Sequence, residues 1–359
     1  MTALLFIVLF LVIVAAIAGP VIYLQTRRQR RELKNFERGL KMVPLLIHLP
    51  PPSEDTEGGG RDVRDVTEEN ISKAQIIYGI ISSTLQKGFK AKFYGQRHFA
   101  FEVVAAKGFI YFYAAVPVTL VEVVKQAVVS AYPSARLEEA MEHNIFNQVG
   151  KLSGVVGGQM KLKESYAYPV ATYQDLKRDT MQALLNALST LEREDGAGVQ
   201  LIMRPADPVW RKNVLGAASK KKKGEDGGKK GGEQILSLGK DLATALVKPP
   251  EAKDKKDSGG HTLSGHDQAV VDAMEDKARQ PGFEVLIRIV VSANISRRAQ
   301  SILNNVVASF SLYDAPGKNG FKFEPAKDVE ELTTDYILRI FPQSETKTIL
   351  NTVELATLF

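Results

Sequence analysis

The feature that most constrains this chain is an uncharged, strongly apolar run over residues 3–24, built almost wholly of Leu, Ile, Val, Phe and Ala. In a helix that rises roughly 1.5 Å per residue, about 20 apolar residues cross the ~30 Å hydrocarbon core of a bilayer. A helix also satisfies its own backbone groups there. The run therefore predicts a single transmembrane helix within residues 1–26, bent near its inner end by Gly19 and Pro20.

Four arginines follow the apolar run at once, and they indicate which way the helix points. They are Arg27, Arg28, Arg30 and Arg31, whereas only the amino group of Met1 precedes the run. Lys and Arg beside a membrane helix are retained on the cytoplasmic side. These arginines are therefore the predicted topology-determining residues. They predict a single-pass protein of the inner (cytoplasmic) membrane, in contact with lipid, with its N-terminus outside and the bulk of the chain in the cytoplasm.

The alternative interpretation of the apolar run is a cleaved secretory signal. Residues 16–18, Ala-Ile-Ala, have the small-x-small pattern of a cleavage site. A secretory signal carries its positive charge before the apolar core, whereas here the charge follows the core and opposes export of the next segment. We therefore expect the anchor to be retained.

The composition of the whole chain is that of a globular protein, with 44% hydrophobic and 25% charged residues, a net charge of +6 and a pI near 9.2. The roughly 330 residues after the anchor suffice for two domains. The chain has no cysteine, which excludes disulfides, cysteine-ligated zinc, iron–sulfur clusters and thiol nucleophiles. The net charge alone does not predict nucleic-acid binding, because much of it lies in the four arginines and one lysine-rich stretch.

Two stretches separate the folded parts. Residues 49–61 (LPPPSEDTEGGGR) contain three prolines and three glycines, and residues 216–267 have too few apolar side chains to offset the entropy lost on ordering. Within the second stretch, residues 234–247 have helical apolar spacing and predict a short helix. The expected parts after the anchor are a basic juxtamembrane segment and linker (27–70), a first domain (71–215), a flexible Lys/Gly-rich insertion (216–281) and a second domain (282–359).

The first domain shows alternating strand and helix patterns. Aromatic and β-branched residues predict strands over 99–105 and 108–116, joined by a hairpin at 106–108. A one-sided apolar stripe predicts a helix over 119–131. The same signals predict strands over 135–140, 160–172 and 198–205 and a helix over 174–192. The order is βαββαβ, the split βαβ arrangement of ferredoxin-like sandwiches, in which two helices cover one face of a four-stranded sheet.

The pattern starts again after the insertion. It predicts strands over 283–292, 321–324 and 335–341 and helices over 296–310 and 345–358. The last strand of a second module is then missing, because the sequence stops at Phe359 in an apolar segment. The predicted fold class is therefore α+β: a single N-terminal transmembrane helix followed by two ferredoxin-like (βαββαβ) sandwich modules, the second truncated. We expect the polypeptide to continue beyond Phe359, or the gene product to be cut short.

Three stretches carry a resemblance to a known family. They are residues 98–140 (HFAFEVVAAKGFIYFYAAVPVTLVEVVKQAVVSAYPSARLEEA), residues 184–207 (LLNALSTLEREDGAGVQLIMRPAD) with Trp210, and residues 349–359 (ILNTVELATLF). In order and wording, the chain resembles the membrane-anchored N-terminal region that precedes the motor domain in conjugative DNA-transfer ATPases of type IV secretion systems, the TraG-like coupling proteins. The resemblance covers most of the chain outside the linkers, and it includes no catalytic signature.

The resemblance implies a motor assembly that moves DNA or protein across a cell envelope, with this region tethering and positioning the motor and mediating protein–protein assembly. The implied partners are an ATPase domain or other secretion-system subunits, and further copies of the chain, since such motors commonly work as symmetric rings. The ATPases of the family carry a G-x-x-x-x-G-K-[ST] phosphate-binding loop, which is absent here: Gly239 and Lys240 precede Asp241, and residues 154–158 contain no lysine. We expect this chain to be no enzyme and to bind no cofactor.

The remaining candidate metal ligands and catalytic groups, which are histidines and acidic residues, do not form a recognisable site in the sequence. His261 and His266 lie five residues apart among glycines, without the helix or the further ligands that a zinc site requires. Glu192, Glu194 and Asp195 crowd a predicted helix end, where carboxylates are usually only solvated. The sequence therefore predicts neither a metal site nor catalytic residues.

A second cationic cluster lies in the insertion. Lipid headgroups and the phosphate backbone of a nucleic acid both attract such cations. The simpler interpretation is a solvated linker, which we favour because no aromatic side chain lies among the lysines to stack on bases. The candidate contacts for an anionic partner are Lys220, Lys221, Lys222, Lys223, Lys229 and Lys230.

Two other functions stay open. The first is a membrane-tethered nucleic-acid-binding module: Tyr111, Phe112 and Tyr113 provide aromatic side chains on one predicted strand, but the glycine and basic signature of an RNA-recognition motif is absent. The second is a membrane enzyme, which no motif in the sequence supports.

Overall fold

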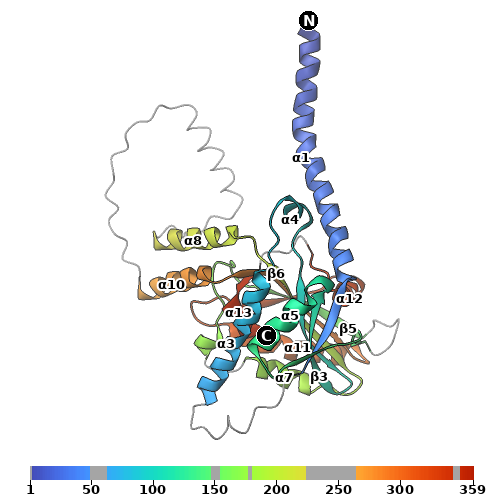
Figure 1. Cartoon of the computed structure of the whole chain (residues 1–359), viewed down its shortest axis with the longest axis vertical. Coiled ribbons are helices and arrows are strands. Elements are labelled where there is room, and N and C mark those ends of the chain that lie inside the picture. The colour runs from blue at the N-terminus through green and yellow to red at the C-terminus, as the bar shows by residue number, and fades with distance from the viewer. Residues whose placement is uncertain (1, 49–62, 147–153, 177–179, 224–263, 343–347) are drawn as a thin grey trace.

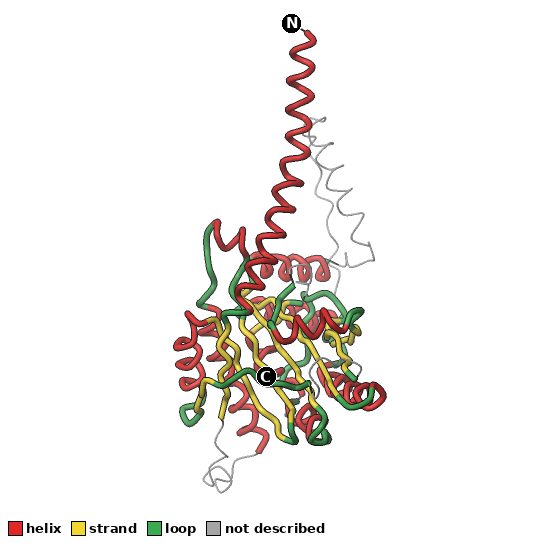
Figure 2. Tube along the Cα trace, turned by 90° about the vertical axis from the view of Figure 1, so that its right-hand side faces the viewer, coloured by secondary structure: helices red, strands yellow, loops and turns green. Residues whose placement is uncertain are grey.

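The computed structural model describes the chain except for residues 1, 49–62, 147–153, 177–179, 224–263 and 343–347, and it leaves the side chains of residues 2–13, 15, 17, 63, 64 and 92 undescribed. Figure 1 shows a body built around one β-sheet, with helices on its faces and one long helix, α1, rising from it. In Figure 2, a quarter turn away, the N-terminal half of α1 again stands clear of the strands.

Helix α1 (Thr2–Gly39) is one continuous helix of 38 residues that runs through Pro20. It contains both the apolar run and the arginines that follow it. Within the residues that the structure describes, no helix is long and apolar enough to cross a bilayer. The predicted transmembrane anchor is therefore wrong, and so is the predicted localisation as a single-pass protein of the inner membrane with its N-terminus outside. The arginines continue the helix toward the body, where Asn35 and Arg38 hold it.

Within the described residues, one sheet contains nine strands, in the order β4-β1-β3-β2-β6-β7-β5-β8, with β9 beside β7. Every pair of these strands is antiparallel. The strands are β1 (Met42–His48), β2 (Phe99–Ala106), β3 (Phe109–Pro117), β4 (Arg136–Glu139), β5 (Val155–Leu162), β6 (Gly196–Pro205), β7 (Gly282–Ser292), β8 (Phe321–Pro325) and β9 (Ile349–Asn351).

Each half of the sheet has the same topology. The first four strands lie in the order β4-β1-β3-β2 and the next four in the order β8-β5-β7-β6. In each half, one helix lies between the first and second strands and another between the third and fourth. These helices are α3 (Val63–Ser82) and α5 (Val121–Ala131) in the first half, and α7 (Met181–Ser189) and α11 (Ser296–Ser309) in the second. The halves join edge to edge through β2 and β6, in a register that places Glu102 opposite Gln200.

The predicted fold class is wrong, because the chain forms one sheet and not two sandwich modules. Strand β5, which the sequence patterns assigned to the first module, pairs with β7 and β8, both of which follow the insertion. Strand β6 pairs with β2 on one side and with β7 on the other. The second half has all four strands, so the predicted truncation is wrong as well. Alternation along a strand predicts which face is buried, but it does not name the neighbouring strand.

Several local predictions also differ from the structure. The strand predicted over 335–341 is the end of α12 (Val329–Ile337) and the turn after it, because Asp328 caps that helix by accepting hydrogen bonds from two main-chain N–H groups. The helix predicted over 345–358 is β9 followed by α13 (Thr352–Leu358), with residues 343–347 outside the described part. Strand β1 and helix α3 were not predicted. The short helix predicted over 234–247 lies outside the described residues.

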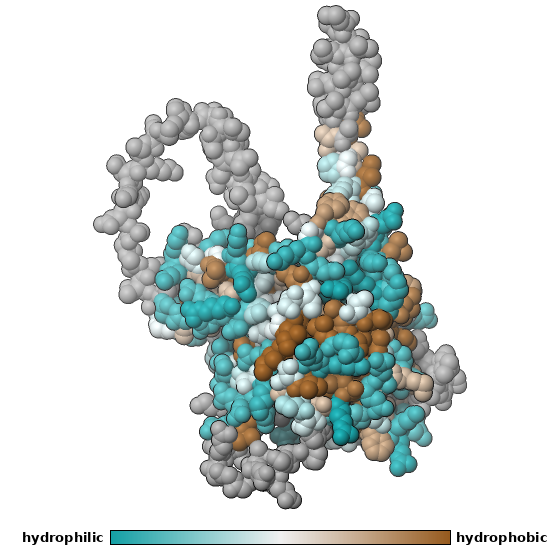
Figure 3. All heavy atoms as spheres, viewed as in Figure 1, coloured by the Kyte–Doolittle hydropathy of each residue, from teal (hydrophilic) through white to brown (hydrophobic). Residues whose placement is uncertain are grey.

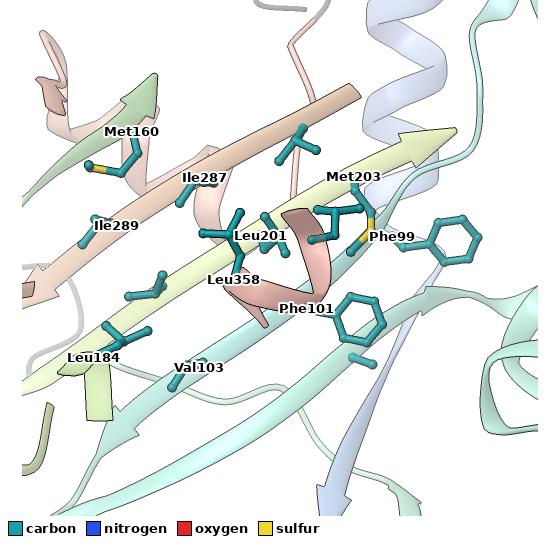
Figure 4. Packing of buried hydrophobic residues seen from close by; sticks show 14 of the residues in the cluster. Phe99, Phe101, Val103, Met160, Leu184, Leu201, Met203, Ile287, Ile289 and Leu358 are labelled. Carbon is teal, nitrogen blue, oxygen red and sulfur yellow. The ribbon is translucent and has the colours of Figure 1, made fainter. Parts of the chain in front are cut away.

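The main core lies on one face of the sheet. Because successive side chains of a strand point to opposite faces, alternate residues of β2 and β6, such as Phe101, Val103 and Leu201, pack together under the helices (Figure 4). Helices α3, α5, α7, α11 and α13 supply the other side of this core. Strands β6 and β7 are buried almost throughout, because α12 and the turn after it cover the opposite face.

Helices α8 (Val209–Lys222) and α10 (Gly265–Arg279) lie side by side at the edge of the body (Figure 1). They pack through a separate small core that includes Trp210, Val214 and Met274. Both ends of the stretch that was expected to be flexible are therefore helical.

The last helix, α13, lies on the helical face of the sheet against α3. In Figure 3, hydrophobic residues gather on the surface in the middle of the body, where Figure 1 shows α13 and α5. The short helices that complete the fold are α4 (Phe89–Tyr94), α6 (Tyr173–Leu176), η1 (Val118–Leu120) and η2 (Phe310–Tyr313).

Candidate functional site: a buried ion-pair network and the groove beside α1

The predicted site residues lie on two separate helices. On α1, Arg28 forms an exposed ion pair with Glu32 (3.0 Å), and Arg31 donates a hydrogen bond of 3.0 Å to the main-chain oxygen of Phe93. Arg27 and Arg30 lie on the same segment, Arg30 on the wall of a groove described below. At least one of the arginines that were predicted to determine topology, Arg31, therefore contacts the body of the protein.

The predicted lysine cluster lies at the end of α8. Lys220, Lys221 and Lys222 form its last turn and Lys223 follows it, while Lys229 and Lys230 lie outside the described residues. Lys221 is within 3.3 Å of Asp267 on α10. One of these lysines therefore joins the two helices.

A row of polar side chains, which sequence analysis missed, crosses the centre of the sheet. Glu102 on β2, Gln200 on β6 and Arg288 on β7 are direct neighbours in register. Gln200 donates to Oε1 of Glu102 (2.7 Å), and Nη1 of Arg288 donates to Oε1 of Gln200 (2.8 Å). All three are buried, on the face opposite the main core. A row of this kind is costly to bury unless every member is bonded.

The row holds the end of α12. Arg288 donates to the main-chain oxygens of Asp335 (2.9 Å) and Ile340 (3.0 Å) and to the carboxylate of Asp335 (3.0 Å). Gln200 also donates to the main-chain oxygen of Tyr336 (3.1 Å). The last carbonyl groups of a helix have no partner within the helix. Main-chain N–H groups of the turn bond the oxygens of Asp335 and Tyr336, so Arg288 and Gln200 add second bonds there, and Arg288 supplies the bond to Ile340.

Arg339 is the second arginine of this network, and it comes from the turn itself. Its φ angle is 51°, in the left-handed region that residues other than glycine rarely adopt. Its guanidinium bonds both oxygens of Glu102 (2.7 and 3.2 Å) and both oxygens of Glu142 (3.0 and 2.9 Å). Burial alone would lower the pKa of Arg339, but the two carboxylates outweigh burial and raise it. The ion pairs therefore hold the strained turn in place.

Two histidines that look scattered in the sequence meet at this network. Nε2 of His98 lies 2.9 Å from the main-chain oxygen of Arg339, and Nε2 of His143 lies 3.0 Å from the hydroxyl of Tyr336. Burial, followed by the positive charges of Arg204 and Arg38, lowers the pKa of His98 to about 3. His98 is therefore neutral at pH 7, and its Nε2 carries the hydrogen that the carbonyl accepts.

The lower end of α1 is fixed to the same region. Nδ2 of Asn35, a buried residue, donates to the main-chain oxygen of Phe341 (2.7 Å). Arg38 donates to the main-chain oxygens of three consecutive residues, Tyr94 (3.2 Å), Gly95 (2.9 Å) and Gln96 (2.7 Å). These bonds attach α1 both to the turn after α12 and to the segment that contains α4.

Gly39, the last residue of α1, permits this close approach. A Cβ added at Gly39 would overlap the main-chain carbonyl of Leu338, which belongs to the turn. Any larger residue would push α1 away from the turn.

The buried side chains of the network are bonded to one another and to the turn after α12. Glu102, Gln200, Arg288 and Arg339 are all buried, and their charged groups bond one another or main-chain carbonyls. Across the part of the chain that the structure describes, no three His, Asp or Glu side chains are placed to hold a metal ion. The buried members of the network therefore fix the geometry of the turn, whereas Glu142, at its edge, has a side chain that is 58% exposed. One sequence signal could have found it: Glu102, Gln200 and Arg288 each interrupt an otherwise apolar strand.

The groove beside the network is open. It lies between α1 and residues 86–95, with a cavity volume of about 700 Å³. The charged residues that line it are Arg30, Lys34, Glu37, Arg38, Lys87 and Lys90.

Comparison with known families places the chain in a family without an assigned function. A family described as a domain of unknown function (DUF8128) matches residues 63–358, from the start of α3 to the end of α13. The match covers both halves of the sheet except β1, and it does not include α1. No curated protein matches the chain.

Proposed function

We propose that this chain, which belongs to the DUF8128 family, is a non-catalytic positioning region of a DNA-transfer machine. The observation that carries the proposal is the fixed attachment of α1 to the body. At about 1.5 Å per residue, the 38 residues of α1 span about 57 Å, and the N-terminal half stands clear of the sheet (Figure 1). A stiff arm of this kind sets a distance between a partner at its far end and a partner on the body.

The rigidity of the body supports the same role. The polar row joins β2, β6 and β7 across the line where the two halves of the sheet meet, and it also binds the turn that carries Arg339. The arm is bonded to this turn through Asn35. A force applied to the arm is therefore passed directly to the centre of the sheet, since packed and bonded elements move together.

The resemblance to the N-terminal regions of TraG-like coupling proteins supplies the biological setting. In that setting the partners are an ATPase domain, other secretion-system subunits and further copies of the chain. The network supports a positioning role, because the charged groups of Glu102, Arg288 and Arg339 are buried and bonded to one another or to the turn. We therefore assign the motor activity to a partner.

The attachment of the arm can be measured by electron–electron distance spectroscopy. The chain has no cysteine, so the pair Val21→Cys and Val129→Cys, at exposed positions on α1 and α5, places two spin labels without background. We expect one narrow distance distribution. Gly39→Ala, which forces α1 away from Leu338, is expected to broaden it. Gly79→Ala on α3 is the matched control, because an added Cβ there meets nothing within 4 Å.

The function itself is tested in the native host. Deletion of the gene is expected to reduce DNA transfer between cells, the wild-type gene and Gly79→Ala to restore it, and Gly39→Ala to restore it poorly although the protein accumulates. Transfer that is unchanged by the deletion, or a broad distance distribution in the wild-type chain, would overturn the proposal.

A further inference from the structure

The groove between α1 and residues 86–95 carries more positive charge than the attachment of the arm, which uses Arg38, accounts for. Five cationic side chains line it, Arg30, Lys34, Arg38, Lys87 and Lys90, against one carboxylate, Glu37, which leaves a net charge of +4. Its volume of about 700 Å³ falls within the roughly 300–1,000 Å³ of ordinary ligand sites. We propose that this groove binds single-stranded nucleic acid, with the phosphates between its walls and a base on Phe89.

The one carboxylate is already shared. Glu37 lies 2.7 Å from Nζ of Lys34 and 2.8 Å from Nζ of Lys41, and hydrogen bonds from these two lysines lower its pKa to about 2. Among the described residues, Arg30, Lys87 and Lys90 have no acidic side chain within 4 Å. Three cations on two facing walls are therefore available to a ligand.

The floor of the groove is positive as well. Burial, followed by the nearby charges of Arg204 and Arg97, lowers the pKa of Arg38 to about 10. Like charges held this close repel one another, and an anion placed among them relieves the repulsion. A phosphodiester backbone supplies such an anion at each nucleotide.

An exposed aromatic side chain, Phe89, directly precedes Lys90 of the groove in the sequence. The side chain of Phe89 is 71% exposed, although its ring stacks on that of Phe93 (centroids 5.8 Å apart, planes 23° apart). Phe93 is held in turn by Tyr94 (5.0 Å) and by Tyr23 of α1 (6.1 Å). The sequence around α4, KGFKAKFYG, thus alternates basic and aromatic residues, which the lysine cluster of α8 does not.

This combination favours a single strand over the other polyanions. Proteins that bind single strands combine a cationic groove along the backbone with aromatic rings on which bases stack. In a duplex the bases are already stacked on each other, so none is free to stack on the ring of Phe89. A lipid surface is flat, and its headgroups do not reach Arg38 between two walls. The site lies beside the attachment of the arm and does not depend on the positioning role.

The direct test is fluorescence anisotropy with the full chain. The probes are a labelled oligothymidylate of about 20 nucleotides, a duplex of the same length and vesicles that contain phosphatidylserine. We expect the single strand to bind best and its affinity to fall as salt rises from about 50 to about 200 mM, the signature of counterion release.

Matched variants separate the two parts of the site. The pair Lys87→Ala and Lys90→Ala is expected to weaken single-strand binding about 20-fold near 0.1 M salt and to flatten the salt dependence, since each lost phosphate contact reduces the slope by about 0.7. Phe89→Ala is expected to weaken binding about tenfold while leaving the salt slope unchanged. The control pair Lys220→Ala and Lys222→Ala removes the same charge from the end of α8.

The proposal fails if the wild-type chain does not bind the oligonucleotide, if the duplex or the vesicles bind as well as the single strand, or if the control pair weakens binding as much as the groove pair does. Because all five substituted side chains lie at the surface, circular dichroism is expected to show the same fold for each variant. A variant that unfolds is replaced by Lys87→Glu, which is expected to weaken binding further.

Discussion

Asn35 in the first helix donates a hydrogen bond of 2.7 Å to the main-chain oxygen of Phe341, 306 residues later in the sequence. The bond joins α1 to the turn after α12, and this turn is the segment that the polar row of the sheet also holds. One short segment therefore connects the arm, the centre of the sheet and the buried arginines.

The amide of Asn35 is expected to contribute measurably to stability. Asn35→Ala leaves the buried oxygen of Phe341 without its donor, which costs about 1–3 kcal/mol of unfolding free energy. Urea unfolding measures the loss. The control is Asn304→Ala, at an exposed position on α11, where the change is expected to stay within about 0.5 kcal/mol. Equal losses in the two variants would show that the bond to Phe341 is unimportant.

Arg288 is expected to be the most costly residue of the network to replace. Arg288→Met preserves much of the volume but removes the donor to Gln200, the donor to the main-chain oxygen of Ile340, one of the two donors to the main-chain oxygen of Asp335, and the ion pair of Asp335. Breaking a buried pair in this way costs about 3–5 kcal/mol. Chemical denaturation of the variant, compared with that of Arg297→Met at an exposed position on α11, measures the difference. A loss below about 1 kcal/mol would contradict the bonding described here.

Two substitutions of Arg339 distinguish the contribution of backbone strain to stability from that of ion pairing. Both Arg339→Ala and Arg339→Gly remove the bonds to Glu102 and Glu142, but only glycine adopts a φ of 51° without penalty. We expect the glycine variant to be more stable than the alanine variant by about 1 kcal/mol, although both are less stable than the wild type. Thermal unfolding of the two proteins side by side gives the difference. An alanine variant at least as stable as the glycine variant would show that the turn is not strained.

His98 is expected to make stability depend on pH. Its folded pKa, about 3, lies below the ordinary value of 6.5, so below pH 6.5 the unfolded chain takes up a proton that the folded chain does not. Stability is therefore unaffected by His98 above pH 6.5 and falls as the pH drops toward 3, by up to about 1.4 kcal/mol per pH unit. In His98→Gln, where the amide still donates to Arg339, the slope between pH 6.5 and 5 is expected to be smaller by that amount. Parallel curves for the two proteins would contradict the assignment.

Local features of the fold were predictable where the signal is short-range. The hairpin between β2 and β3 is confirmed: Lys107 and Gly108 have φ angles of 56° and 83°, the positive values that tight hairpin turns require. Helices α5 and α11 are likewise confirmed, because a one-sided apolar stripe fixes both the helix and its buried face. The strand predicted over 335–341 is wrong: Tyr336 and Phe341 are buried, but Asp328 starts a helix that ends inside the segment.

The candidate site was not predictable in the same way. Glu102 and Arg339 are 237 residues apart, and nothing in the sequence near either residue indicates the other. A charged residue within an apolar strand shows that a partner must exist, because an unpaired buried charge is too costly. It does not show where the partner comes from. The groove is similar: the basic and aromatic residues around α4 are visible in the sequence, but their placement opposite Arg30 of α1 is not.

The amino-acid sequence by itself determined most of the strands, some of the helices, and the lack of cysteine chemistry, since these depend on residue type and on spacings of a few positions. The tertiary structure alone decided that β6 joins two halves into one sheet, that α1 continues past its apolar run onto the turn after α12, and that isolated polar residues of four elements meet. Those outcomes depend on which distant backbone groups and charged side chains bond one another once they are buried away from water. The spacing of neighbouring residues in the sequence does not indicate these long-range partners.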